Sequence, residues 1–209
     1  MNMDQNGQGM LWGSCPVRVA HEPIPGLRYV PQFLSEEESA ELLQFLEGLE
    51  EHDWQRIRLR GMVAKRTMLC FGWNYVTTSK SLTPAAEMPT ILLALRNRCA
   101  TAAAVVPEAL KQVIVSRYSE GAGIGAHIDA PVFGEPVVGV SLLGPASMKF
   151  EREGSEPVTI VLEPRSLYVM TGEARWKWKH SIPPVKSLRY AITFRTLRVA
   201  CPQFMYQPL

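Results

Sequence analysis

Residues 188 to 195 read Leu188-Arg189-Tyr190-Ala191-Ile192-Thr193-Phe194-Arg195, and this stretch has the clear pattern of a β-strand. Apolar residues alternate with polar or small ones, which is the pattern of a strand with one buried face, because successive side chains on a strand point to opposite sides. The apolar face should pack on the core or beneath helices. The other face carries two arginines that flank two small residues.

Period-two patterns of the same kind fill the second half of the chain. We predict strands, separated by Gly, Pro and Ser turns, over residues 112–118, 137–143, 147–152, 158–162, 166–170 and 188–197. Two helices precede them. One runs over 36–48 behind a capping box of Ser35 and Glu38, and the other begins at Pro89 and ends near residue 105.

This order of elements predicts an α+β fold that is mainly β. Helices followed by many short strands indicate a β-sandwich or jelly roll with the two N-terminal helices packed on one face. The sequence has 209 residues, of which 46% are hydrophobic and 20% charged, so it can bury a substantial core. We expect a flexible tail over 1–16 and a single domain over 17–209, with the helices and a flap in 17–110 and the jelly roll in 111–200.

The cysteine pattern and the hydropathy bear on location. The four cysteines are scattered and form no C-x-x-C pair, which fits a reducing compartment better than a disulfide framework. No basic segment followed by an apolar run opens the chain, and no run of 18 apolar residues occurs. We therefore expect a cytoplasmic protein with no membrane contact. Separately, we expect a monomer, although the sequence does not reveal the oligomeric state.

Three residues have the composition of a metal site. His127 and Asp129 stand two positions apart, so both side chains share a face if the segment is extended. Together with His180 they make the two-histidine, one-carboxylate set that binds non-haem Fe(II). The interval from 129 to 180 leaves room for four strands, which would bring the ligands together across a barrel mouth. The alternative is a turn aspartate and a solvent-facing histidine.

The polar face of residues 188–195 suits a dianion. Arg189 and Arg195 flank the two small residues, and a planar guanidinium binds a carboxylate through two hydrogen bonds. Ser116 and Tyr118 share a face of the strand before the His-x-Asp motif and could hydrogen-bond an acid bound beside the metal. The alternative is an edge strand with two exposed arginines.

Basic residues cluster in two places. Five lie between residues 56 and 66 with no acidic residue among them, and an aromatic group follows: Arg56, Arg58, Arg60, Lys65 and Arg66, then Phe71, Trp73 and Tyr75. They form either a flap that holds phosphates and stacks a base, or a solvated strand face with aromatic residues in the core. A second cluster around His180 either contacts a nucleic-acid backbone or is a set of solvated strand ends: Arg175, Lys177, Lys179 and Lys186.

The motifs occur in an order that resembles a known family. The run Arg117-Tyr118-x-x-Gly121, His127-x-Asp129, His180 and Arg189-x-x-x-x-x-Arg195 is similar to the AlkB family of Fe(II)- and 2-oxoglutarate-dependent dioxygenases. Residues 165–175 and 192–195 also look like family blocks in the right order. The resemblance covers about residues 29 to 198.

The resemblance implies a double-stranded β-helix, an enzyme, and Fe(II), 2-oxoglutarate and O₂ as its requirements. The implied metal ligands are His127, Asp129 and His180. The implied co-substrate residues are Arg189 at the distal carboxylate, Arg195 near the metal-chelating carboxylate, and Tyr118 and Ser116 as hydrogen-bonding groups. Many members carry asparagine where this chain has Ala191, and some carry it where this chain has Ser116.

The implied reaction is oxidative dealkylation of N-alkylated bases in single-stranded DNA or RNA, as in DNA repair, with release of aldehyde, succinate and CO₂. The expected substrate contacts are Arg58, Arg60, Lys65 and Arg66 to phosphates, and Trp73 and Tyr75 by stacking. Residues 130–133 carry no acidic or amide side chain that would read a base. Two alternatives remain: a dioxygenase of protein side chains or small molecules, and a non-catalytic member that binds nucleic acid.

Overall fold

Two antiparallel sheets build the molecule. The computed structural model describes residues 23–59 and 62–198, so the tail expected over 1–16 lies outside the described part. The larger sheet has the strand order β1 (Leu27–Val30), β11 (Leu167–Met170), β8 (Phe133–Leu142), β13 (Arg189–Leu197), β6 (Leu110–Tyr118), β3 (Met62–Phe71) and β2 (Gln55–Leu59). The smaller sheet has the order β10 (Val158–Leu162), β9 (Ala146–Glu151), β12 (Lys179–Ile182) and β7 (Ile124–His127).

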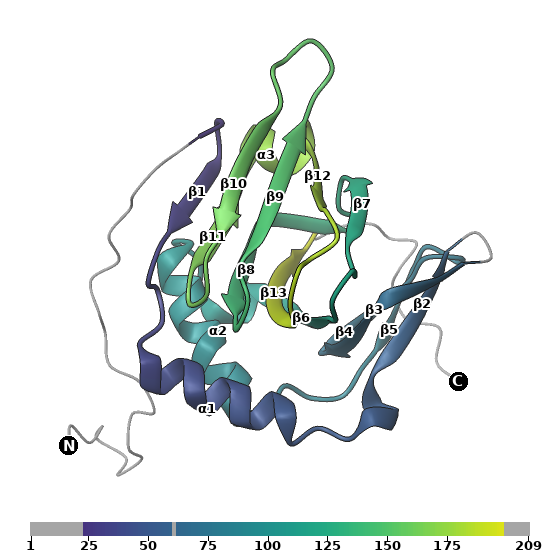
Figure 1. The fold of residues 1–209 in the computed structure, drawn as a ribbon, viewed down its shortest axis with the longest axis vertical. Helices are drawn as coiled ribbons and strands as arrows, with labels where there is room; N and C mark the ends of the chain where they lie inside the picture. Colours follow the sequence, from purple (N-terminus) through teal and green to yellow (C-terminus); the bar gives the residue numbers. More distant parts are fainter. Residues whose placement is uncertain (1–22, 60–61, 199–209) are drawn as a thin grey trace.

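Short helices and one separate hairpin complete the described fold. Strands β4 (Trp73–Val76) and β5 (Ser81–Pro84) pair only with each other. The α-helices are α1 (Glu36–Glu47), α2 (Thr90–Ala102) and α3 (Gly172–Trp176), and the 3₁₀ turns are η1 (Glu51–Asp53) and η2 (Pro107–Ala109). Helices α1 and α2 lie on one side of the larger sheet (Figure 1). The predicted mainly β fold with two helices on one face is confirmed.

Helix α1 begins where its capping box predicts. The Glu38 amide donates to the Ser35 hydroxyl at 3.2 Å, and the Ser35 amide donates to the Glu38 carboxylate at 2.8 Å. These bonds satisfy amides that the helix itself leaves without partners. Glu38 also accepts from Arg98 of α2, so the same carboxylate ties the two helices together.

The core has two layers, one on each side of the larger sheet. In the outer layer, helix residues such as Leu42 and Leu92 pack on the apolar face of β13, where Tyr190, Ile192 and Phe194 are buried as predicted. Leu188, which was predicted on the same apolar face, is not buried: it precedes β13 and is 40% exposed. The inner layer lies between the two sheets and contains Trp178, which follows α3, and residues of both sheets: Tyr118, Val137, Tyr168, Met148, Phe150 and Ile182.

The deviations from the predicted boundaries are local. Strand β8 starts at Phe133, four residues before the predicted 137, and the short elements β5, β12 and α3 carried no pattern strong enough to predict them. Within the described residues, no helix has the length and apolar content needed to cross a membrane. The domain boundaries, the monomeric state and the cytoplasmic location stay predictions.

Candidate active site

The metal-ligand candidates meet at the open end between β7 and β12. His127 ends β7 and pairs in register with His180 of β12, and their ring centroids lie 4.4 Å apart. Asp129 follows two residues after His127, and one ligand atom from each of the three residues lies within 4.8 Å of the others. Strands β8, β9, β10 and β11 intervene in the sequence, as the spacing predicts.

The donor atoms of this triad are free to bind a cation. His127 Nδ1 lies 2.9 Å from the Gly125 carbonyl, which can only accept, so this bond selects the tautomer that has its proton on Nδ1 and a lone pair on Nε2. His180 Nδ1 and Asp129 Oδ2 are buried and have no hydrogen-bond partner in the described chain. Burial lowers the pKa of His180 to about 4, partly opposed by Asp129, so its imidazole is neutral at pH 7. Neutral imidazoles and an ionised carboxylate are what a divalent metal requires.

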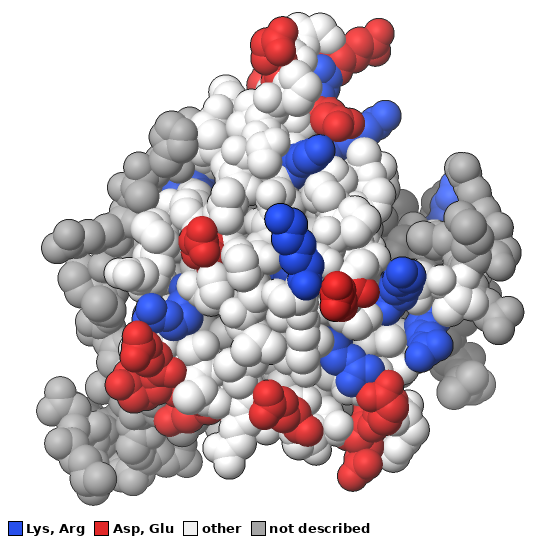
Figure 2. All heavy atoms as spheres, in the orientation of Figure 1, with Lys and Arg blue, Asp and Glu red and all other residues white. Residues whose placement is uncertain are grey.

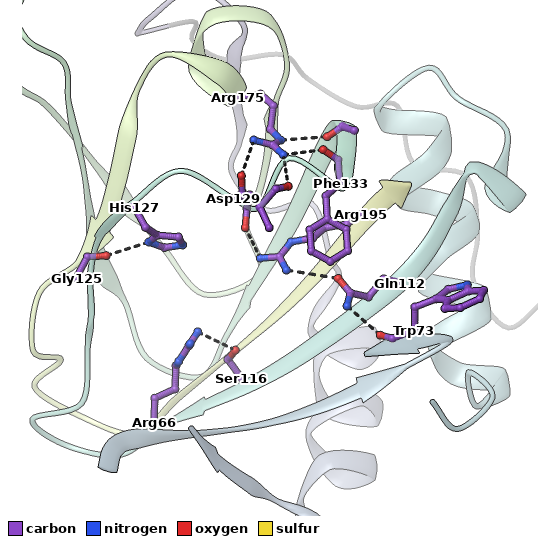
Figure 3. Close-up of polar contacts among 12 residues, drawn as sticks. Arg66, Trp73, Gln112, Ser116, Gly125, His127, Asp129, Phe133, Arg175 and Arg195 are labelled. Atoms are coloured by element: carbon purple, nitrogen blue, oxygen red, sulfur yellow. Dashed lines mark hydrogen bonds and ion pairs between the residues drawn. The ribbon is translucent and has the colours of Figure 1, made fainter. Parts of the chain in front are cut away.

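Asp129 is held ionised by its neighbours. Burial raises the pKa of this carboxyl, but the neighbouring positive charges, that of Arg195 first, outweigh it and leave the pKa below its usual value. Arg195 donates from Nη2 to Asp129 Oδ1 at 2.5 Å and from Nη1 to Gln112 at 3.4 Å. Figure 3 shows this chain of contacts from Arg175 through Asp129 and Arg195 to Gln112. Arg195 is thus fixed directly beside a metal-ligand candidate.

Arg175 fixes the backbone that carries Asp129. It is 1% exposed, and its guanidinium donates to the carbonyls of Asp129 at 3.3 Å, Ala130 at 3.1 Å, Phe133 at 2.7 Å and Gly134 at 3.0 Å. We predicted that Arg175, like the lysines around His180, either contacts a nucleic-acid backbone or is solvated. For Arg175 this prediction was wrong, because the residue is buried and bound to carbonyls of the protein itself. The alternation of the neighbouring tryptophans could not have identified it, because Trp176 and Trp178 alternate with Arg175 and residues 172–176 form the helix α3.

The polar face of β13 forms a second part of the site. Arg189 is 1% exposed, donates from Nη2 to Ser141 at 3.0 Å, and lies 5.1 Å from the ring centroid of Tyr118. Its Nε has no hydrogen-bond partner and no acidic residue pairs with it among the described residues, and burial lowers its pKa. A buried cation without a counter-ion is costly, so this guanidinium suits a bound anion. Ser116 lies beside it, two residues from Tyr118 on the same strand face.

Lys65 and Arg66, neighbours in the flap, face opposite ways, and Arg56 of the same flap is exposed. Lys65 is exposed, and its Nζ lies 3.2 Å from the point where a Cβ on Gly121 would stand, at the glycine-rich approach to His127. Arg66 instead turns inward and lies 3.5 Å from the Ser116 hydroxyl (Figure 3). It also lies 3.4 Å from the Tyr118 hydroxyl. The Arg58 side chain and the whole of Arg60 lie outside the described residues.

The aromatic candidates also separate. Tyr75 meets Phe133 edge to face at 5.6 Å between centroids, and Phe133 lies 4.8 Å below the Arg195 guanidinium that binds Asp129. Trp73 contributes its carbonyl, which accepts from Gln112 at 2.9 Å, while its indole lies on the far side of Gln112 from the triad (Figure 3). Of the two candidates, Tyr75 is therefore the one whose ring contacts Phe133, next to the arginine that binds Asp129.

Comparisons with known proteins agree with this geometry. The family model of the 2OG-Fe(II) oxygenase superfamily matches residues 26–196, so the chain belongs to that superfamily. This membership makes it a 2-oxoglutarate-dependent dioxygenase that requires Fe(II), 2-oxoglutarate and O₂, and the triad of His127, Asp129 and His180 is the site that fits the metal.

Relatives narrow the class to the AlkB family, as the motifs predict. The tRNA (carboxymethyluridine(34)-5-O)-methyltransferase ALKBH8 of Mus musculus is 29% identical over 78% of this chain and 25% of its own length. The alkylated DNA repair protein ALKBH8 homolog of Arabidopsis thaliana is 28% identical over 77% of this chain and 51% of its own length. The chain thus spans a quarter to a half of these relatives. The solved structure of OsALKBH1 shares the fold, with a TM-score of 0.69 and 16% identity over 87% of this chain and 100% of that chain.

Proposed function

We propose that this dioxygenase oxidatively removes N-alkyl groups from bases of single-stranded DNA or RNA, releasing aldehyde, succinate and CO₂. The observation that carries the proposal is the aromatic pair of Tyr75 and Phe133 beside Arg195 and Asp129. A planar ring bound against Tyr75 would present its substituents toward the triad. Base-to-aromatic stacking contributes about 1–3 kcal/mol per base and tolerates any base.

In this proposal each polar group has one task. His127, Asp129 and His180 hold Fe(II), which with 2-oxoglutarate and O₂ supplies the hydroxylating chemistry when bound. Hydroxylation of the N-alkyl carbon gives a hemiaminal, which loses aldehyde and restores the base. Arg189 and Tyr118 bind the distal carboxylate of 2-oxoglutarate because the buried guanidinium has no acidic partner among the described residues. Ser116 lies on the strand next to β13, opposite Ala191, and Arg195 keeps Asp129 ionised.

The substrate base must leave its stack to reach the triad, which costs least in single strands. Lys65 at the rim supports a phosphate contact, which weakens as the salt concentration rises. The segment after Asp129 offers little for reading a base: its side chains are apolar through Phe133, and the carbonyls of Asp129, Ala130 and Phe133 accept from Arg175. Selection should therefore depend on stacking and adduct size more than on hydrogen bonds to the base edge.

The names of the relatives support nucleic acid as the substrate class, since one refers to tRNA and another to alkylated DNA. One observation favours a different substrate, a protein side chain or a small molecule. On the face shown in Figure 2, acidic and basic side chains of the described residues are interspersed rather than gathered into one basic surface.

The test is turnover of defined substrates by the Fe(II)-loaded protein. We would supply 2-oxoglutarate, air and single-stranded RNA or DNA oligonucleotides methylated on base nitrogens, and measure succinate, formaldehyde and the mass of the base. The proposal expects one formaldehyde and one demethylated base for each substrate-dependent succinate. Asp129→Ala should abolish all three products because it removes a metal ligand.

Two matched variants test the substrate contacts. Lys65→Ala should weaken oligonucleotide binding and reduce its salt dependence, whereas Lys149→Ala, an exposed lysine on β9, should change neither. Tyr75→Ala should raise the KM for the oligonucleotide about tenfold. Succinate formation that no oligonucleotide stimulates would reject the nucleic-acid substrate and favour a protein or small-molecule substrate. Equal effects of Lys65→Ala and Lys149→Ala would reject the contact at the rim.

A further inference from the structure

Arg66 belongs to a row of side chains that crosses three strands. Thr67 of β3 pairs with Arg117 of β6, which sets Arg66 beside Tyr118, and Tyr118 pairs in turn with Arg189 of β13. The guanidinium of Arg66 lies 5.6 Å from the Tyr118 ring centroid and that of Arg189 lies 5.1 Å from it. One neutral phenol therefore has two cations beside it, one from each neighbouring strand.

This pair of positive charges has no counter-ion within the described chain. The hydrogen-bond acceptors of Arg66 are the neutral hydroxyls of Ser116 and Tyr118, and that of Arg189 is the hydroxyl of Ser141. Other arginines of the same sheet do pair with carboxylates: Arg117 with Glu51 at 2.7 Å and Arg195 with Asp129 at 2.5 Å. Two like charges around one buried ring repel each other, and a bound anion would offset this repulsion.

We propose that Arg66 is a positioning residue for the distal carboxylate of 2-oxoglutarate and that it acts through Tyr118. A phenol has one proton to donate and can accept as well. Because Arg66 donates to the Tyr118 oxygen, the phenol proton is left to point at the carboxylate that Arg189 binds. The second guanidinium also raises the positive potential where that carboxylate lies.

The neighbouring row explains why the pocket depends on such a residue. Ala191, opposite Ser116, has no polar side-chain group, and the Ser116 hydroxyl lies within reach of Arg66. Polar groups that could hold the co-substrate are thus few on this part of the sheet. The inward direction of Arg66 is visible in Figure 3 and separates it from Lys65, which faces solvent. The inference concerns the co-substrate alone and does not depend on which substrate is oxidised.

The test is a calorimetric titration of Mn(II)-loaded protein with two keto acids, without any oligonucleotide. One is 2-oxoglutarate, and the other is 2-oxopentanoate, which has a methyl group in place of the distal carboxylate. Arg66→Met should raise the Kd for 2-oxoglutarate about tenfold and that for 2-oxopentanoate less than about twofold. Lys111→Met removes an exposed cation from the same sheet and should leave both Kd values within about twofold.

A second pair of variants tests the route through Tyr118. In a Tyr118→Phe background the phenol oxygen is absent, so adding Arg66→Met should weaken 2-oxoglutarate binding by less than about threefold. If Arg66→Met does not fold, Arg66→Lys serves instead, since it keeps the charge but loses the planar fork, and it should weaken 2-oxoglutarate binding about threefold.

Three results would overturn the inference. An unchanged Kd for 2-oxoglutarate in Arg66→Met would exclude a role of Arg66 in holding the co-substrate. Equal weakening for both keto acids would mean general damage to the site. An undiminished tenfold loss in the Tyr118→Phe background would exclude the route through the phenol. Failure of the proposed function would appear elsewhere, as succinate formation that no oligonucleotide stimulates.

Discussion

Replacing Arg175 by methionine should remove the hydrogen bonds that hold the loop after the metal-ligand candidate Asp129 in place. The guanidinium donates to four backbone carbonyls between Asp129 and Gly134, at 2.7 to 3.3 Å, and it is 1% exposed. Methionine fills a similar volume but donates nothing. The carbonyls would therefore stay buried without their donor, or the loop would move until water reaches them.

The size of the effect follows from these bonds. A buried acceptor that loses its donor costs roughly 1–3 kcal/mol, and the four contacts are not additive because one relaxed loop satisfies several of them. Burial lowers the pKa of Arg175, which shows that holding this charge also has a cost, and methionine removes that cost. Together these terms give a loss of about 3–4 kcal/mol in the free energy of unfolding.

Urea unfolding and a Mn(II) titration measure the two consequences. The variant should lose about 3–4 kcal/mol of stability, and its Mn(II) affinity should fall about 10- to 100-fold, because Asp129 is no longer oriented. Arg152→Met is the matched control. Arg152 pairs at 2.8 Å with Glu173, which lies in α3 as Arg175 does, but both side chains of this pair are about one-third exposed. It should cost less than about 1 kcal/mol. A Mn(II) affinity that is equal in the two variants would refute the role assigned to Arg175.

Three further outcomes are expected. Arg189→Met should raise the Kd for 2-oxoglutarate about 100-fold while the Mn(II) affinity stays constant, since the buried guanidinium has no partner other than neutral groups in the described chain; unchanged binding would place the co-substrate elsewhere. Ser35→Ala should cost about 1 kcal/mol in urea unfolding because α1 loses its cap; no loss would show that the cap is dispensable. Burial raises the pKa of the Cys70 thiol to about 11, so iodoacetamide at pH 8 should modify it about 100-fold more slowly in the native protein than in urea; peptide mass spectrometry measures both rates, and equal rates would contradict the burial.

The sequence predicted those parts of the site that depend on strand periodicity. The alternation of residues 188–195 placed Arg189 and Arg195 on one face, and the structure has both on the inner face of β13. The spacing of His127 and Asp129 anticipated their convergence with His180 because short antiparallel strands fill the interval between them. The hydrophobic period and the residue spacing can be read within one segment, so predictions that use only these two properties do not require knowledge of distant segments.

Charge alone predicted much less about the basic residues. Arg66 and Lys65 are neighbours in sequence and both are cations, yet one faces the Tyr118 hydroxyl and the other faces solvent. Arg175 was grouped with three lysines although it is buried and bound to backbone carbonyls. Whether a cation is solvated or buried depends on carbonyls and hydroxyls that distant segments supply, and no pattern within one segment records them.

The β2–β3 hairpin has a consequence for where this enzyme can accommodate an added residue. Its outer strand β2 pairs with β3 through a register shift between Arg56 and Arg58, whereas the inner part of β3 pairs without interruption with β6, from Thr67 to Phe71. An added residue in the irregular part would enlarge the existing bulge and leave the register of the inner ladder unchanged. In the inner ladder, a register shift of one residue would exchange the inward and outward faces. A change in the length of the outer strand would thus leave Arg66, which adjoins the uninterrupted ladder, in its present direction. One hairpin therefore combines a part whose pairing is irregular with a part whose register must be kept.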